Sequence, residues 1–476
     1  MSTSRRDFLK AAALAPAILG AAPDTPPNIL FIICDQMRAD ALGALGGRNG
    51  RTPNLDRLAS RGVVFENAFS NNPVCVPSRK SMWTSLYPHQ HGSLTNRDGE
   101  FLELRNTALG YFKDRGYRIG YVGKNHAFSK QAMGSIDMPS IRDREPFREY
   151  NRWVPPYWHC DSYWPAERTY AHLNTEDALR FLAVRDRTPF FLTVSYFDPH
   201  PPYMAPSEYT SRYTSREMQL PEFIPPKRLS PRLDEYYRAL RFDRVRDTDL
   251  TESMRYYHAA IEWGVDQQVG RLVNELERRG MLDNTIIVFT SDHGDFMGEQ
   301  RMTGKGMFLT ESLLHVPAIW RVPGMRKGHR STDLVQGIDI LPTLAELTGG
   351  MRRPEWMGRS LKPCLQGGSN QDADHAIFTS AGYGELSKEV LDEKSELHQT
   401  SDLPLHTRVM NENVKPSHRT AVVRTREWKM ILSETRPPEL YRMNGGYIER
   451  ENIAESAQVA AVRRSLERRL QQWWKW

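Results

Sequence analysis

Cysteine is scarce in this sequence of 476 residues, which contains four cysteines and no Cys-x-x-Cys pair. The wide spacing supports neither a disulfide framework nor a cysteine zinc site, so a cysteine with a chemical role has to act singly. Internal repeats and low-complexity tracts are also missing. The composition, with 39% hydrophobic and 26% charged residues, is that of a globular protein and excludes the disordered and fibrous classes.

A long apolar run is missing as well. The longest stretch, residues 11–22, is too short to span a bilayer and is interrupted by Pro16. It follows Ser-Arg-Arg-Asp-Phe-Leu-Lys at residues 4–10, which resembles a twin-arginine export signal, and it ends in small residues that suit a signal peptidase. We expect residues 1–22 to be a signal peptide and the mature protein to be periplasmic or secreted without a membrane anchor. The alternative is an amphipathic N-terminal helix.

Neither sign of charge dominates. The 64 lysines and arginines exceed the 58 acidic residues by six, and both signs are scattered along the chain. This balance favours an anionic substrate slightly, and it does not predict nucleic-acid binding.

After a proline-rich joint at residues 23–27, apolar runs of strand length alternate with helical patterns, which is typical of an α/β sheet with crossover helices. The longest predicted helix covers residues 251–279, where apolar residues recur at three- and four-residue steps. Beyond residue 366 the pattern changes to short strands near 419–424 and 428–432 and a charged helix near 457–474. The predicted strands of the larger part are residues 28–34, 118–122, 190–197 and 285–290.

Two segments, residues 127–170 and 199–232, are rich in proline, tyrosine, tryptophan and arginine and lack clear periodicity. We interpret them as long functional loops. Their aromatic residues either stack on sugar rings or form a hydrophobic lid, and the sequence leaves both readings open for Trp153, Tyr157, Trp158, Tyr163 and Trp164.

Polar side chains follow each of the four predicted strands. Ligands bind at the carboxyl ends of strands in open α/β sheets, so these residues are expected to converge there. Such an edge would combine oxygen donors suited to a hard divalent cation with basic groups, and the lack of further histidine or cysteine argues against structural zinc. The residues are Asp35 with Gln36, Lys124 with His126, His200, and Asp292 with His293.

The sharpest motif is Cys-Val-Pro-Ser-Arg at residues 75–79. The proline suits the first turn of a helix, so Cys75 is predicted at a helix N-terminus, which favours an anion. The motif resembles that of the sulfatase family in the alkaline phosphatase-like superfamily, in which this cysteine is oxidised to formylglycine. The alternative to a catalytic role is a buried cysteine that only packs ahead of a helix.

Further motifs follow in the order found in that family. Ser-Asp-His-Gly-Asp at residues 291–295 resembles its second metal motif, and Lys305 stands where these enzymes keep a sulfate-binding lysine. Residues 120–126 resemble the Gly-Lys-Trp-His segment with Asn125 replacing the tryptophan, while residues 198–202 resemble the segment with another active-site histidine. Glu-Leu-Tyr at 439–441 is similar to the C-terminal signature. Gln36 and His293 depart from the aspartate and asparagine of many members.

The resemblance implies an alkaline phosphatase-like fold, with a large mixed central sheet flanked by helices in residues 27–366 and a smaller C-terminal α+β subdomain in residues 367–476. It also implies one divalent cation, expected to be calcium, and conversion of Cys75 to formylglycine by a maturation enzyme. The implied metal ligands are Asp35, Gln36, Cys75, Asp292 and His293.

The resemblance assigns roles to the remaining polar residues. Arg79, Lys124 and Lys305 would supply fixed positive charge, His126 would act as a base, and His200 with Lys305 would face the leaving-group oxygen. The function expected is hydrolysis of a sulfate ester, with a sulfated carbohydrate as substrate. Two alternatives are a phosphonate monoester or phosphodiester hydrolase of the same superfamily and a catalytically inactive binder of sulfated glycans.

Overall fold

The structure is a computed structural model that describes residues 26–142, 159–184, 186–239, 242–369, 371, 375–383, 418–443 and 448–474. The predicted signal peptide lies outside these residues, as do Trp153, Tyr157 and Trp158. Within the described part of the chain, no helix is both long and apolar enough to cross a lipid bilayer.

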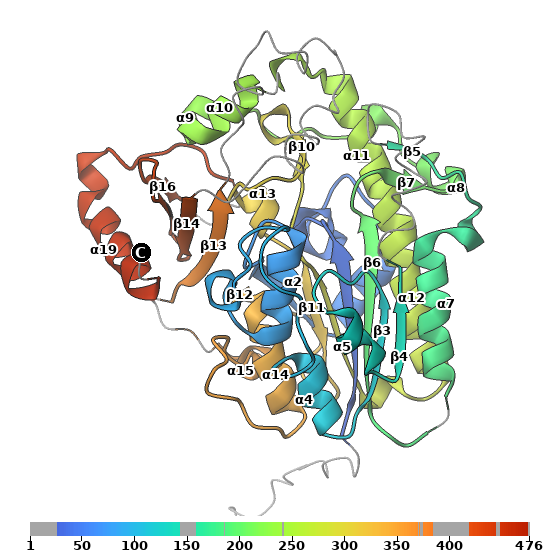
Figure 1. Ribbon diagram of the computed structural model, residues 1–476. Helices are drawn as coiled ribbons and strands as arrows, with labels where there is room; N and C mark the ends of the chain where they lie inside the picture. The colour runs from blue at the N-terminus through green and yellow to red at the C-terminus, as the bar shows by residue number, and fades with distance from the viewer. Residues whose placement is uncertain are drawn as a thin grey trace, which may run out of the picture.

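An eight-stranded sheet in the order β12-β2-β11-β8-β1-β6-β3-β4 runs through the centre of the larger part (Figure 1). Strand β11 is antiparallel to both neighbours and all other pairs are parallel, so the sheet is mixed, as expected. The four predicted strands are confirmed as the adjacent strands β8, β1, β6 and β3. The strands are β1 (Asn28–Asp35), β2 (Val63–Phe69), β3 (Arg118–Gly123), β4 (Met138–Ile141), β6 (Phe190–Pro199), β8 (Thr285–Ser291), β11 (Ala318–Arg321) and β12 (His329–Gln336).

Helices cover both faces of this sheet, which explains why its central strands are apolar throughout. In β1, Leu30 and Ile32 pack on one face, while Ile29 and Phe31 pack on the other. The first face is covered by α1 (Pro53–Ser60), α7 (Tyr170–Ala183), α11 (Asp247–Ile261) and α12 (Gln268–Arg278). The second is covered by α2 (Cys75–Thr84), α4 (Ala108–Asp114), α5 (Lys130–Gly134), α14 (Ile340–Leu347) and α15 (Lys362–Leu365).

The long helix predicted over residues 251–279 is present in α11 and α12, but six residues between them, Glu262–Gln267, form π-helical turns. Gly264 in these turns lies against the carboxyl end of β6. A Cβ atom at Gly264 would lie 2.4 Å from Cγ of Asp198, so a larger residue does not fit without movement. A periodic pattern does not reveal such an inserted residue, because the apolar stripe continues on both sides of it.

The C-terminal part contains a separate antiparallel sheet, β13-β14-β15-β16, as predicted from the short strands. One face packs on the larger part through residues such as Val422 and Ile431, and the other packs on α19 through Leu466 and Leu470. The elements are β13 (Ile377–Tyr383), β14 (His418–Arg424), β15 (Trp428–Ser433), β16 (Glu439–Arg442) and α19 (Ala460–Trp473).

Where the structure describes them, the two segments predicted as long loops are more structured than expected. Local turn and capping residues give them short helices and strands that the lack of long periodicity concealed. Strands β5 and β7 pair in parallel, so residues 159–161 lie beside residues 203–205. The elements are β5 (His159–Asp161) and η3 (Ala166–Arg168), then β7 (Tyr203–Ala205), α8 (Ser207–Thr210), η4 (Ser215–Glu217), α9 (Pro226–Leu229) and α10 (Pro231–Ala239).

Candidate active site

The carboxyl ends of β1, β3, β6 and β8 meet at one edge of the sheet. Asp35 ends β1, Lys124 follows β3, and Asp292 follows β8, and all three are buried. His200 comes directly after β6. The shared direction of these strands brings together residues that are up to about 260 positions apart in the sequence. Asp35 and Asp292, for example, are both bound to Arg79.

Cys75 is the first residue of α2, as the sequence predicts, and its side chain is only 1% exposed. Val74 before it is extended, and Pro77 lies in the first turn of the helix. Ser78 holds this turn against the segment 291–295, because its hydroxyl donates to the Asp292 carbonyl oxygen at 2.5 Å. The sulfur atom thus lies where helical N–H groups favour an anion.

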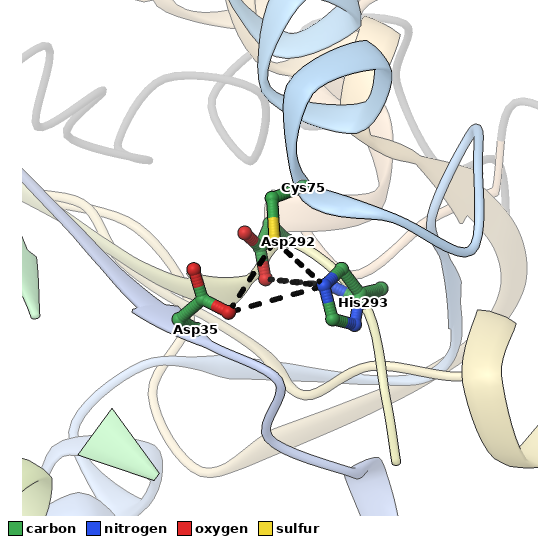
Figure 2. Close-up of side chains that lie close together, drawn as sticks. All are labelled: Asp35, Cys75, Asp292 and His293. Atoms are coloured by element: carbon green, nitrogen blue, oxygen red, sulfur yellow. Dashed lines mark hydrogen bonds and ion pairs between the residues drawn. The ribbon is translucent and has the colours of Figure 1, made fainter. Parts of the chain in front are cut away.

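Four buried side chains place possible metal-ligating atoms within 4.8 Å of one another: Asp35, Cys75, Asp292 and His293 (Figure 2). Sγ of Cys75 lies 3.2 Å from Nε2 of His293 and 3.6 Å from Oδ1 of Asp35. Nδ1 of His293 donates to the Gly294 carbonyl oxygen at 2.8 Å, so in the neutral ring Nε2 carries the lone pair and faces the cluster. This donor set suits one divalent cation.

Arg79 binds both carboxylates from the side opposite the cluster. Its Nε donates to Oδ2 of Asp292 at 2.7 Å, and Nη2 donates to Oδ2 of Asp35 at 3.1 Å. The other oxygen of each carboxylate, Oδ1, lies on the side of His293, at 3.7 Å for Asp292 and 3.9 Å for Asp35. The fully buried guanidinium therefore orients two carboxylates that would otherwise repel each other.

Two lysines add positive charge around Cys75. Nζ of Lys305 lies 2.8 Å from Sγ of Cys75, and Nζ of Lys124 lies 3.7 Å from it while also pairing with Oδ2 of Asp35. Burial opposes ionisation of Asp35, but the charges of Lys124 and Lys305 hold its pKa well below its usual range. Burial likewise opposes the charge on Lys305, yet nearby Cys75 and Asp35 raise its pKa. Lys305 therefore remains positively charged at neutral pH.

Gln36 adds a side-chain oxygen atom that could bind a cation beside these four residues. Its backbone has a positive φ of 72°, and its N–H donates to Oδ1 of Asp292 at 3.1 Å. The side chain is fully buried, and within the described part of the chain no donor reaches its Oε1. A buried acceptor without a partner costs free energy unless something binds it, so Gln36 fits a cation ligand.

Burial and nearby charges lower the pKa values of the two predicted histidines, His126 and His200. Burial, with the charges of Lys124 and Arg79, lowers the pKa of His126 well below its ordinary value. Burial and Lys305 do the same for His200. Nδ1 of His200 contacts the Pro201 carbonyl oxygen at 2.6 Å, and this nitrogen must be the donor because a carbonyl oxygen only accepts. Both rings are therefore neutral at neutral pH.

The structure adds three polar residues that the sequence did not single out. Ser195 accepts a hydrogen bond from Nη1 of Arg79 at 2.7 Å, and Asp295 accepts from both Gln36 and Tyr203. Asp295 was visible in the Ser-Asp-His-Gly-Asp motif, whereas Ser195 and Tyr203 stand in an ordinary strand and an aromatic-rich segment. Only tertiary structure reveals these two.

The family model for sulfatases matches residues 27–351. The chain belongs to the sulfatase family. This sulfatase is 26% identical over 481 residues to the arylsulfatase of Clostridium perfringens, and the match covers 92% of this chain and 99% of that protein. It is 28% identical to the N-acetylglucosamine-6-O-sulfatase of Bacteroides thetaiotaomicron, with 73% and 72% covered.

Among solved structures, the fold is similar to that of a phosphonate monoester hydrolase from Silicibacter pomeroyi, with a TM-score of 0.77 and 24% identity over 94% of each chain. This likeness confirms the predicted architecture of a large mixed sheet with a smaller C-terminal subdomain. Together the family match and the named sulfatases identify the protein as a sulfuric ester hydrolase.

Proposed function

We propose that this enzyme hydrolyses a sulfate ester of a carbohydrate, with Cys75 converted to formylglycine and one divalent cation, expected to be calcium. The observation that carries the proposal is the convergence of the buried ligand atoms of Asp35, Cys75, Asp292 and His293 within 4.8 Å, with Nζ of Lys305 2.8 Å from Sγ of Cys75. Asp35, Gln36, Asp292 and His293, with the modified side chain at position 75, would hold the cation.

The modified side chain would supply the nucleophile, and the cation would lower the pKa of that nucleophile and neutralise sulfate oxygens. Cys75 stands in place of this group, and its neighbours fit an oxygen nucleophile at the same position. Lys124 and Lys305 are at hydrogen-bonding distance of sulfur and would donate to that oxygen or to the sulfate.

Arg79 and the two lysines serve the anion differently. All donor atoms of Arg79 that have partners are turned to Asp35, Asp292, Ser195 or the Lys124 carbonyl oxygen. Arg79 therefore organises the metal carboxylates, while the ammonium groups of Lys124 and Lys305 hold the sulfate. This differs from the expectation that all three act directly on the transition state.

His126 has the properties of a base. Its lowered pKa keeps it neutral at the pH at which a base must accept a proton, and no partner reaches its buried Nδ1 from the described residues. We assign it the removal of a proton when sulfate is expelled from the modified side chain.

The leaving-group acid is better served by Lys305 than by His200. Lys305 is charged and carries protons to give, whereas His200 is neutral and its Nδ1 proton is committed to the Pro201 carbonyl oxygen. His200 would then orient the leaving group, and Lys305 would donate the proton.

A carbohydrate substrate is supported by the relatives and by the loops around the site. The Bacteroides relative is named for N-acetylglucosamine-6-sulfate chemistry. The exposed aromatic residues Tyr163 and Trp164 come directly after β5, which pairs with β7 in the segment that follows His200. Aromatic rings in such a position suit stacking on sugars.

The second candidate is hydrolysis of a phosphonate monoester or a phosphodiester. The observation that favours it is the pair Gln36 and His293 in the ligand cluster, in place of the aspartate and asparagine of many sulfatases.

The sulfatase proposal also includes export through the twin-arginine signal. A maturation enzyme would act on Cys75 before export, because Cys75 is buried once the chain has folded.

A turnover screen tests the assignment. Purified enzyme is assayed on sulfated mono- and oligosaccharides, an aryl sulfate, a phosphonate monoester and a phosphodiester, while mass analysis of the Cys75 peptide reports the aldehyde. We expect the highest kcat/KM on a sulfated saccharide, loss of turnover in Cys75→Ala, and normal turnover in the matched Cys160→Ala. A preference for the phosphorus esters over every sulfated saccharide, or an unmodified thiol in fully active enzyme, would overturn the proposal.

A further inference from the structure

Gln36 has two chemically different ends in its side-chain amide, and only one of them can bind a cation. Its Nε2 donates to Oδ2 of Asp295 at 2.7 Å. Its Oε1 is buried and meets no donor from the described residues. A reversed amide would present N–H groups to the cation and would turn oxygen toward a carboxylate, which is doubly unfavourable.

Asp295 is fully buried, and its position is itself fixed from two sides. The hydroxyl of Tyr203 donates to Oδ2 of Asp295 at 2.8 Å, and Nη1 of Arg38 donates to the Asp295 backbone oxygen at 3.0 Å. The ring of Tyr203 packs edge-on against Tyr257, with 5.5 Å between ring centroids. The hydroxyl of Tyr257 donates to the Gln36 backbone oxygen at 3.2 Å, so this shell fixes both the backbone and the side chain of Gln36.

We propose that Asp295, held by Tyr203, is a positioning residue that fixes the amide of Gln36 with its oxygen available to the cation. Oδ2 of Asp295 accepts hydrogen bonds from both Nε2 of Gln36 and the Tyr203 hydroxyl, so it selects the Nε2 end of Gln36 and leaves Oε1 for the metal. Tyr203 belongs to the segment that begins with His200, so the same segment serves both the leaving-group side and the metal side. The proposal rests on the cation of the proposed function.

The test is a calcium titration of chelator-treated, full-length enzyme by calorimetry. It is run at pH 8 in a buffer that does not bind calcium. We expect one site in the wild type and about 10- to 100-fold weaker binding in Asp295→Asn, because an asparagine satisfies either orientation of Gln36. Tyr203→Phe should weaken binding measurably, by up to about 10-fold. Asp266→Asn, the same change at a buried carboxylate bound to Asn54, is the matched control and should leave affinity unchanged.

Rescue separates orientation from a general loss of charge or stability. A glutamate at position 36 offers oxygen at both ends, so it needs no partner to select the end that faces the cation, and Asp295→Asn then also removes a carboxylate from beside its other oxygen. In the Gln36→Glu background, Asp295→Asn should therefore cost less than about 3-fold in calcium affinity, against the 10- to 100-fold loss next to the native glutamine.

Each other outcome has a definite meaning. If Asp295→Asn lowered calcium affinity equally next to Gln36 and in the Gln36→Glu background, Asp295 would act only through its charge, and the positioning role would be overturned. Unchanged affinity in both Asp295→Asn and Tyr203→Phe would overturn it as well, and the tyrosine variant decides the matter if the aspartate variant does not fold. A wild type that binds neither Ca²⁺ nor Mn²⁺ would instead overturn the cation of the proposed function and, with it, this inference.

Discussion

Arg79→Met removes the guanidinium that separates the two metal carboxylates while keeping an unbranched side chain. In the metal-free protein the change leaves Asp35 and Asp292 buried without the donors that reach their Oδ2 atoms from Arg79 at 3.1 and 2.7 Å. Breaking a buried ion pair by removal of one partner costs about 3–5 kcal/mol. Lys124 still pairs with Asp35, so we expect a loss near the lower end of that range, about 3 kcal/mol.

A bound divalent cation would neutralise the same two carboxylates from their Oδ1 side. We therefore expect the cation to bind the variant's unpaired carboxylates more tightly than those of the wild type, so that the loss in the free energy of unfolding shrinks by at least about 1 kcal/mol when calcium is saturating. Urea unfolding of wild type and variant in chelator and in calcium measures all four values. Arg79→Lys retains the charge but not the forked geometry and should give an intermediate loss.

A loss below about 1 kcal/mol in chelator would show that Arg79 does not hold the carboxylates as described. An equal loss with and without calcium would refute the idea that the cation and Arg79 use opposite oxygens of the same two groups.

Three further outcomes are expected. Asp292→Ala should abolish stoichiometric metal and most turnover, as metal analysis and a sulfatase assay will show; retained metal and rate would contradict the ligand assignment. His126 must be neutral to act as a base, and its pKa lies below the ordinary 6.5, so kcat should stay level as pH falls through 6.5 and decline only below it; an acid limb above 6.5 in a pH profile would contradict this. Lys305→Ala should depress hydrolysis of a sulfated sugar more than that of an activated aryl sulfate, by about 10-fold or more, with a smaller difference for His200→Ala; equal ratios would remove Lys305 from the acid role.

The central strands and the site edge were predictable because one physical rule governs both. Strands covered on two faces must be apolar throughout, so β1, β3, β6 and β8 are plain in the sequence, and the polar residues that follow them stand out by contrast. Strands β2 and β12 carry polar residues such as Asn67 and Asp333, so their sequences resemble exposed segments. Their place in the sheet depends on pairing with each other, which no local pattern encodes.

The parts of the site that escaped prediction depend on directions of side-chain atoms. The sequence places Arg79 near an anion, but only the structure shows that its donors are used by carboxylates. The resemblance places His200 with Lys305 at the leaving-group oxygen, but only the contact of Nδ1 with the Pro201 carbonyl oxygen shows that this proton of His200 is committed. Residue type and spacing determine which groups meet, and tertiary hydrogen bonds determine which atom of each group faces the substrate.

The arrangement of charge bears on why sulfatases and phosphonate hydrolases share one fold. A sulfate monoester, a phosphonate monoester and a phosphodiester are all monoanions at neutral pH, so the net charge of Asp35, Asp292, Arg79, Lys124 and Lys305 cannot separate them. The three differ in what surrounds the central atom, because a sulfate ester offers three non-bridging oxygens that share the charge where the phosphorus esters offer two. Lys124 and Lys305 near Cys75, together with the proposed cation among Asp35, Asp292 and His293, would provide donors or positive charge for all three oxygens. A phosphorus ester would turn a carbon or an esterified oxygen toward one of these charges and leave it poorly paired, and an unpaired buried charge is costly. The site should therefore discriminate in favour of sulfate by pairing, even though the fold accepts either class.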